Sequence, residues 1–165
     1  MAQPHGESIE AAVGKAVGRI PSGVYILTTI HHGRPEVMMA SWVQQAGFEP
    51  LCVSIAVQKE RPIRQALLSS RRFALAVLPQ DDTSLMKKYA RGVPPGQEPF
   101  EGIEVLNTPR GLPVPAGALA WLECELMQAC DFGGDHELHV ARVTAGQVLR
   151  EGKSFTHLRG SGTHY

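Results

Sequence analysis

Two long strand-like runs separated by a short turn restrict the fold more than any other feature of the chain. The runs are ALAWLECELMQAC at residues 118–130 and ELHVARVTAGQVL at 137–149. In the first run, Leu122, Cys124 and Leu126 alternate with two glutamates, which is the two-residue period of a strand. The sequence DFGGDH between the runs supplies a glycine-rich turn. The pattern predicts a long antiparallel hairpin and hence a fold built on a sheet.

Shorter segments add further strands. Four runs have strand-like composition: VYILTTI (24–30), EVMMASWVQQAG (36–47), LCVSIAV (51–57) and FALAVL (73–78). The sequence HHGRP between the first two predicts a second hairpin turn. In the run at 51–57, bulky side chains alternate with small ones, so one face of that strand is expected to leave room for a neighbour.

Helical patterns are few and short. The sequence predicts helices at 8–18 with Ser8 as N-cap, at 61–70 with Pro62 in the first turn, and at 81–90 with a cap at Asp82 or Thr83.

Residues 91–117 are rich in glycine and proline and are predicted as a loop with at most one short strand, IEVLN. A long irregular loop in a small domain is usually functional, or covers an edge or an interface. Many strands with sparse helices, and no internal repeat, favour one antiparallel barrel or sandwich over residues 1–165.

Charge and composition exclude several classes of protein. Sixteen basic residues balance sixteen acidic ones, whereas nucleic-acid and anionic-membrane binders normally carry a basic excess. The chain contains no run of eighteen apolar residues, and its N-terminus has no signal-peptide pattern. We therefore expect no nucleic-acid or membrane partner. The three cysteines form no CxxC motif, which favours a reduced, cytoplasmic setting.

The cysteines and histidines give no sign of a metal site. Cys130, His136 and His139 are close in sequence and His31 precedes another histidine, but no metal-binding spacing frames them. Cys130 would lie roughly 20 Å from the cysteine six residues before it on an extended strand, too far for a disulfide. The remaining cysteine, Cys52, is predicted to be in the core.

Seven segments, in order, carry a resemblance to a known family. They are GRIPSGVYILTT, MMASWVQQAGFEPLCVSIAVQKER, RRFALAVL, LMKKYARGVPPG, LAWLECEL, GGDHELHVARV and HLRGSGTHY, covering about residues 16–165. The chain resembles the flavin reductase-like family with the FMN-binding split barrel, and within it the flavin reductase domain of cyanobacterial diflavin proteins. The resemblance implies a mainly β, antiparallel split β-barrel of Greek-key type with a few short flanking helices.

The resemblance also implies a flavin site in two sequence blocks, 39–45 and 54–61. FMN combines a flat ring, which needs an apolar surface, with a hydroxylated chain and a phosphate. The strand at 39–42 offers a thioether, a small residue, a hydroxyl and an indole, and positive charge at the start of the 61–70 helix suits the phosphate. The cofactor-binding residues expected on this basis are Met39, Ala40, Ser41, Trp42, Gln45, Ser54, Ala56, Lys59 and Arg61.

Simpler interpretations of these residues remain open at this stage. Ser41, Gln44 and Gln45 are also what a solvated edge strand would carry, and Trp42 is also a typical core residue. The pair of cations at the helix start is also typical of an ordinary protein surface.

Two further segments are implicated by the resemblance. His136, in the GGDH turn, is expected beside the exposed face of the flavin, where it would act on a stacked nicotinamide as the catalytic residue. Its alternative role is a turn pair with Asp135 that holds the hairpin. Near the C-terminus, Arg159 is expected to approach the cofactor and Tyr165 to pack nearby.

The chain departs from the family pattern at two positions. Relatives carry asparagine where FALAVL has Ala76, and serine where this chain has Gly47. With Ala76 a hydrogen bond near the cofactor would be lost, and the sequence leaves open whether Ala76 and Gly47 weaken flavin binding.

The leading hypothesis is a homodimeric, NAD(P)H-dependent flavin reductase that transfers hydride from NADH or NADPH to FMN, with FAD or riboflavin as alternative flavins. The electrons would pass to free flavin or to a protein acceptor. No Rossmann GxGxxG motif occurs, so nicotinamide recognition would be shallow. Two alternatives are an FMN-carrying electron-transfer protein without nicotinamide activity and a split-barrel scaffold that has lost flavin.

Overall fold

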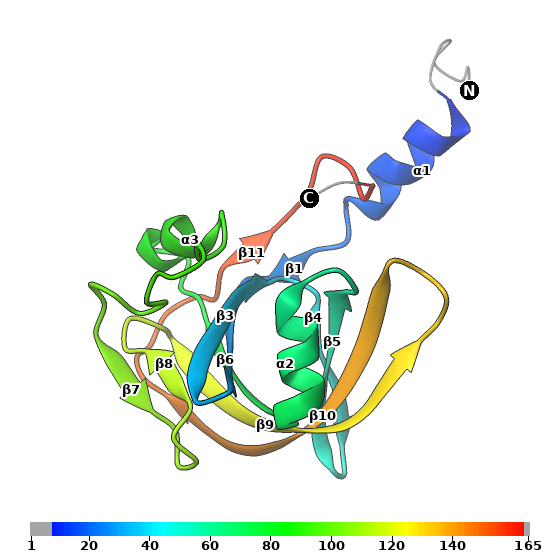
Figure 1. Cartoon of the computed structure of the whole chain (residues 1–165). Coiled ribbons are helices and arrows are strands. Elements are labelled where there is room, and N and C mark those ends of the chain that lie inside the picture. The colour runs from blue at the N-terminus through cyan, green and yellow to red at the C-terminus, as the bar shows by residue number, and fades with distance from the viewer. Residues whose placement is uncertain (1–7, 164–165) are drawn as a thin grey trace.

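A strongly curved antiparallel sheet of seven strands surrounds one helix (Figure 1). The computed structural model describes residues 8–163 of the chain. The strands follow the order β3-β2-β6-β9-β10-β5-β4 across the sheet. Their bounds are β2 Tyr25–His31, β3 Arg34–Ala40, β4 Val43–Phe48, β5 Leu51–Gln58, β6 Arg72–Val77, β9 Ala120–Asp131 and β10 His136–Val148.

The sheet curls because its two edge strands are consecutive in the chain. β3 and β4 lie at opposite ends of the strand order, yet only Ser41 and Trp42 separate them. The two edges must therefore meet at this corner, where the backbone N–H of Ala56 in β5 donates to the carbonyl of Trp42 at 3.0 Å. The curled sheet is the predicted antiparallel barrel.

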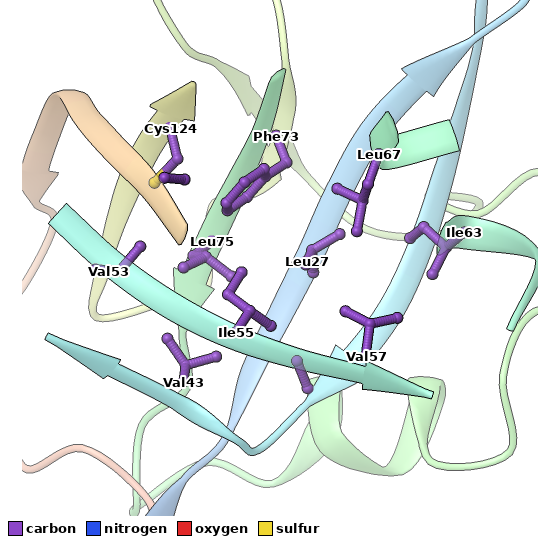
Figure 2. Packing of buried hydrophobic residues seen from close by; sticks show 12 residues of the cluster. Leu27, Val43, Val53, Ile55, Val57, Ile63, Leu67, Phe73, Leu75 and Cys124 are labelled. Atoms are coloured by element: carbon purple, nitrogen blue, oxygen red, sulfur yellow. The ribbon is translucent and has the colours of Figure 1, made fainter. Parts of the chain in front are cut away.

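The helix α2 (Pro62–Ser70) fills the concave side of the sheet (Figure 1). Its Ile63 and Leu67 are buried and point at side chains from several strands, among them Leu27, Ile55 and Phe73 (Figure 2). Burying a side chain of this size stabilises the fold by about 1.5–3 kcal/mol. The packing fixes the position of the N-terminus of α2 relative to the end of β5.

A smaller core lies on the other face, beneath α3 (Ser84–Tyr89). Tyr89 is buried, and its hydroxyl donates to the carbonyl of Pro99 at 2.9 Å, which fastens the loop that follows the helix. The two-stranded ribbon of β7 (Val105–Asn107) and β8 (Pro113–Pro115) continues this side of the molecule.

The N-terminal helix α1 (Ile9–Val17) projects from the barrel (Figure 1). Its contacts include the C-terminal segment, where a Cβ on Gly14 would meet Ser161 at 3.0 Å and a Cβ on Gly18 would meet the Arg159 carbonyl at 2.9 Å. The pairing of β1 (Ser22–Gly23) with β11 (Thr156–His157) joins the same two parts of the chain. Gly14 and Gly18 are thus positions where the C-terminal segment packs against the helix and its end.

Most predicted elements are confirmed. The long hairpin is β9 and β10, with Leu138 opposite Cys130, and the HHGRP turn joins β2 to β3. In that turn His32 and Gly33 both have positive φ, of 50° and 76°, as a two-residue turn between strands requires. Ser8 is the N-cap of α1 and accepts from the Ala11 amide, and Pro62 is the first residue of α2. The described helix α3 is shorter than the predicted one.

Two predictions about strands were wrong. Residues 36–47 were expected to form one strand, but the chain leaves the sheet at Ser41 and Trp42 and re-enters it at the opposite edge. The segment 91–117 contains two short strands instead of at most one, because Val105–Asn107 and Pro113–Pro115 pair with each other. Barrel closure explains the first error, and prolines placed in a strand on a ribbon edge explain the second.

The two departures from the family pattern lie in tightly packed places. Ala76 is fully buried among Ile26, Leu78 and other apolar side chains. At Gly47, next to an irregularity in the β4–β5 register, a Cβ would approach the sulfur of Cys52 to 2.9 Å. Glycine at this position therefore fits the packing of Cys52, which is buried as predicted.

Candidate functional site

A groove of about 1020 Å³ follows the edge strand β3. All seven residues of β3 contribute to its wall, as do Ser41 and Trp42 at the end of that strand. The other sides come from the end of β5, the start of α2, the loop after α3, and His157 and Arg159. This volume lies at the upper end of the range for small-molecule sites.

The β3–β4 corner forms one end of the groove, called here the inner end: Met39 to Trp42, Ala56, Arg61 and Arg159. The guanidinium of Arg159 donates from Nη2 to Oγ of Ser41 at 3.1 Å, and its Cζ lies 4.7 Å from the centre of the Trp42 ring. Trp42 is 36% exposed, so part of the indole is accessible to a bound molecule. The inner end thus combines an aromatic face, a hydroxyl and a cation.

His136 packs against the Trp42 ring at the corner and does not itself line the groove. Its ring lies 4.6 Å from that of Trp42, tilted by 45°, and its side chain is almost entirely buried. Nδ1 lies 2.9 Å from a carboxylate oxygen of Asp135, and this contact lowers the pKa of Asp135. His136 therefore reaches the groove through the indole of Trp42.

The N-terminus of α2 opens onto the same end. Arg61 is the N-cap residue, and its side chain makes no capping hydrogen bond; the first turn contains no acidic residue. Arg61 is exposed and lines the groove together with Pro62 and Ile63. Partial positive charge at an uncapped helix start, next to a guanidinium, is a suitable environment for a phosphate.

Arg64, Glu137 and His139 form a charged network between α2 and β10. The guanidinium of Arg64 donates to both carboxylate oxygens of Glu137, at 2.9 and 3.0 Å, and this hydrogen bonding lowers the pKa of Glu137. Nε2 of the buried His139 lies 3.0 Å from Oε2 of Glu137. Burial lowers the pKa of His139, which favours its neutral form. The network connects α2 to the first residues of β10.

The structure brings seven predicted residues together at the groove: Met39, Ala40, Ser41, Trp42, Ala56, Arg61 and Arg159. Three others do not line it. Lys59 makes an ion pair with Asp131 at 2.6 Å, Ser54 donates to the Gln44 carbonyl at 3.4 Å, and Gln45 is exposed beside a second, smaller cavity. The roles of these three and of His136 toward a ligand stay predictions. Tyr165 lies outside the described residues.

Sequence reasoning missed several other residues that line the groove. His31, His32 and Arg34 from the β2–β3 turn and Arg91 from the loop after α3 line it, and none of them was selected as a binding residue. The one signal was the glycine- and proline-rich composition of 91–117, which predicted a functional or edge-covering loop. The start of this loop does line the groove along edge strand β3.

Two features are absent from residues 8–163. No cluster of three or more histidine, cysteine or acidic side chains has the arrangement of a metal site. None of the described helices has the length and apolarity needed to cross a membrane.

Comparison with known proteins identifies relatives over nearly the whole chain. Residues 17–161 match the model of the flavin reductase like domain. The chain is 38% identical over 161 residues to a putative diflavin flavoprotein A 3 of Nostoc sp., and 35% identical over 161 residues to diflavin flavoprotein A 1 of Synechocystis sp.. Each alignment covers 96% of this chain but 28% of the relative, so the chain spans little more than a quarter of these proteins.

Solved structures show the same fold. An NADH:FAD oxidoreductase of Streptomyces globisporus superposes with a TM-score of 0.80 at 27% identity, covering 90% of this chain and 87% of that one. The flavin reductase component of a bacterial two-component tryptophan halogenase gives 0.79 at 26% identity, covering 88% and 91%. The predicted split barrel is confirmed.

Proposed function

This chain belongs to the flavin reductase like family, and from that premise we propose that it binds FMN and reduces flavin with hydride from NADH or NADPH. The single observation that carries the proposal is the inner end of the groove. There the exposed face of Trp42, the Arg159–Ser41 hydrogen bond and the uncapped start of α2 meet in one place.

The residues of the inner end fit the parts of FMN. Met39, Ala40 and Trp42 offer the apolar surface that a flavin ring requires, with a small residue where close approach is needed. Ser41 supplies a hydroxyl for the polar chain. Arg61 and the first amides of α2 suit the phosphate, because an arginine and a helix start both favour an anion.

Bound flavin would supply the redox chemistry, so the protein need not contribute a proton donor or acceptor to the transfer. The task of the chain is to position the two molecules. Arg159 stacks on Trp42 and limits where the indole can lie, and His136 with Asp135 holds the other side of the same ring. We place the nicotinamide on the exposed face of the flavin, with His136 acting through Trp42.

The proposal includes a homodimer. Helix α1 exposes Ile9, Val13 and Val17, which recur every fourth residue and so form one apolar stripe, and Ile20 is exposed just beyond. A second copy of the chain would bury this stripe. Sedimentation equilibrium measures the oligomeric state. A dimer is expected, and Val13→Asp should shift the population to monomer.

The electrons would leave by way of free flavin or a protein acceptor in the cytoplasm. An FMN-carrying electron-transfer protein remains the second candidate. The relatives are named as flavoproteins, and this chain matches only about a quarter of the length of each. In that case a partner protein would reduce the flavin.

One spectroscopic experiment tests the function. The purified protein is incubated with FMN, desalted, and then mixed anaerobically with NADH or with NADPH. We expect flavin absorption to be retained and to bleach within seconds with at least one of the nucleotides. Retained absorption that ignores both nucleotides would favour the electron carrier, and a colourless protein would contradict flavin binding altogether.

A further inference from the structure

Arg159, whose side chain lines the groove, belongs to a segment that lies against α1 (Figure 1). This segment, residues 159–162, is called here the tail, and its backbone bonds to the backbone of the helix and its end. The amide of Arg159 donates to the Gly18 carbonyl at 3.2 Å, and the amide of Gly162 donates to the Gly14 carbonyl at 2.6 Å. A residue of the groove is thus held by a helix that projects from the barrel.

The chain just before the tail is anchored to other elements. Strand β11 pairs with β1, so that Thr156 lies opposite Gly23. The Phe155 amide donates to the Leu78 carbonyl at 2.8 Å. Arg159 lies beyond these anchors, and its backbone amide is held by α1. The position of its backbone therefore depends on how closely the tail approaches the helix.

This close approach depends on glycine at position 18. A Cβ on Gly18 would lie 2.9 Å from the carbonyl oxygen of Arg159 and 3.0 Å from the carbonyl carbon of Ser161. Both are backbone atoms, so a side chain at position 18 would have to displace the tail itself. The dihedral angles of Gly18, φ −61° and ψ −15°, lie in the right-handed helical region that every residue can adopt. The packing of the tail, and not the backbone conformation, accounts for the glycine.

Gly14 differs from Gly18 in the atoms that a side chain would meet. A Cβ on Gly14 would lie 3.0 Å from Oγ of Ser161 and 3.1 Å from Cγ2 of Thr163, which are side-chain atoms. Such side chains can turn to another rotamer, and alanine is favoured over glycine inside a helix. Alanine at position 14 is therefore expected to leave the backbone of the tail in place. The helix and its end offer a matched pair of glycines, of which Gly18 alone is packed against the backbone of Arg159.

We propose that Gly18 is a positioning residue for the flavin site. It lets the tail lie against the end of α1, and the resulting backbone position sets the guanidinium of Arg159 over the Trp42 ring and within hydrogen-bond distance of Ser41. As far as it concerns flavin, the inference rests on the proposed function, because the Arg159–Trp42 pair is taken to be part of the FMN site. The placement of Arg159 on Trp42 can be tested without flavin.

The first test is acrylamide quenching of tryptophan fluorescence in the flavin-free protein. The chain has two tryptophans, of which Trp121 is buried, so the quenching reports mainly on Trp42. Arg159→Gln uncovers one face of the indole and should raise the quenching constant. Gly18→Ala should raise it to a similar value, and Gly14→Ala should leave it at the value of the unmodified chain. An unchanged constant for Gly18→Ala, or an equal rise for Gly14→Ala, would overturn the role of Gly18.

Titration of the same variants with FMN tests the link to the flavin site. Gly18→Ala should weaken FMN binding about three- to ten-fold, as expected when a contact between a cation and an aromatic ring is loosened. Gly14→Ala should stay within about two-fold of the unmodified chain, because it leaves the tail backbone in place. The double variant of Gly18→Ala and Arg159→Gln should bind FMN no more weakly than Arg159→Gln alone, since Gly18 acts through Arg159.

A further loss of affinity in the double variant would show that Gly18 acts by another route, such as the folding or the association of α1, and would overturn the proposal. The two measurements also separate this inference from the proposed function. If Gly18→Ala raises the quenching but neither it nor the unmodified chain binds FMN, the proposed function fails and the positioning of Arg159 stands. If the unmodified chain binds FMN and Gly18→Ala changes neither measurement, the positioning fails and flavin binding stands.

Discussion

The guanidinium of Arg159 lies across the indole of Trp42, with Cζ 4.7 Å from the ring centre, and thereby ties the C-terminal segment to the corner where the barrel closes. The same side chain donates to Ser41, which is 118 residues away in the chain. One residue therefore restrains both the aromatic and the hydroxyl group of the inner end. A contact of this kind is worth about 0.5–2 kcal/mol, depending on how well it is shielded from water.

We predict that Arg159→Gln weakens FMN binding about ten-fold, because it removes a cation from the groove and frees the indole. Arg159→Lys should retain part of the affinity, since it keeps the charge but loses the flat guanidinium. Quenching of FMN fluorescence measures both. The control is Leu158→Ala, which alters an exposed neighbour. If Arg159→Gln bound FMN as tightly as this control does, Arg159 would have no role in the site.

Arg61 gives a prediction that separates FMN from riboflavin, which has the same ring without the phosphate. The chain should bind FMN more tightly than riboflavin, and Arg61→Gln should remove most of that difference while leaving riboflavin affinity unchanged. The reason is that the exposed Arg61 and the uncapped helix start would interact with the phosphate of FMN and with no other part of the flavin. Parallel titrations with the two flavins provide the measurement. An equal loss for both would show that Arg61 does not act on the phosphate.

Buried His139 makes stability depend on pH in a defined window. Burial lowers its pKa below the ordinary value of 6.5, so the unfolded chain takes up a proton at a higher pH than the folded chain does. Stability from this group is therefore complete above pH 6.5 and declines as the pH falls below it. The midpoint of urea unfolding should decrease between pH 7.5 and 5.5. The pKa of Glu137 is lowered from 4.5, so Glu137 does not titrate in this window.

The variant His139→Gln should show a smaller decrease over that range, even if its stability at pH 7.5 is reduced. His157→Gln is the control, because His157 is exposed and its variant should keep the decrease of the unmodified chain. The slope is compared rather than the absolute stability. An identical slope for His139→Gln and the unmodified chain would assign the acid sensitivity to other groups.

The three thiols are predicted to react very differently. Cys52 and Cys124 are buried, and burial raises the pKa of Cys124 to about 12, whereas Cys130 is exposed. Because the thiolate is the reactive form, a water-soluble disulfide reagent should modify one thiol per folded chain at neutral pH. The variant Cys130→Ser should show no rapid reaction, and all three should react in denaturant. Two fast thiols in the folded protein would contradict the described packing.

Local sequence patterns predict those parts of the fold that local chemistry determines. The alternation along 51–57 identifies a strand whose Val53, Ile55 and Val57 are buried, and Pro62 marks the start of α2. The break at Ser41 and Trp42 has no such signal, since apolar residues continue through the corner and barrel closure alone interrupts the strand. Local pattern cannot reveal a constraint that arises between opposite edges of a sheet.

The same limit applies to buried charges and to the site. Glu123 alternates with apolar residues as an outward-facing strand residue should, yet it is buried because the Arg110 amide and the Thr144 hydroxyl bond to it. The family resemblance located the inner end of the groove. It missed the lining residues of the β2–β3 turn and of the loop after α3, because segments far apart in the sequence contribute them to the groove. Lys59 does not line the groove for a similar reason, since its partner Asp131 comes from the distant hairpin.

The structure changes the interpretation of Ala76. The family resemblance implies an asparagine there that would serve the cofactor, but the Ala76 side chain is fully buried among Ile26, Leu85 and other apolar residues. Ala76→Asn would place an amide in this core, and we predict that it lowers the free energy of unfolding by about 1–3 kcal/mol. It should not increase FMN affinity. Ala76→Ser tests the effect of size, because it adds a smaller polar group at the same point. Urea unfolding and FMN titration of both variants give the answer, and a stable Ala76→Asn protein that binds FMN more tightly would show that the amide reaches the flavin.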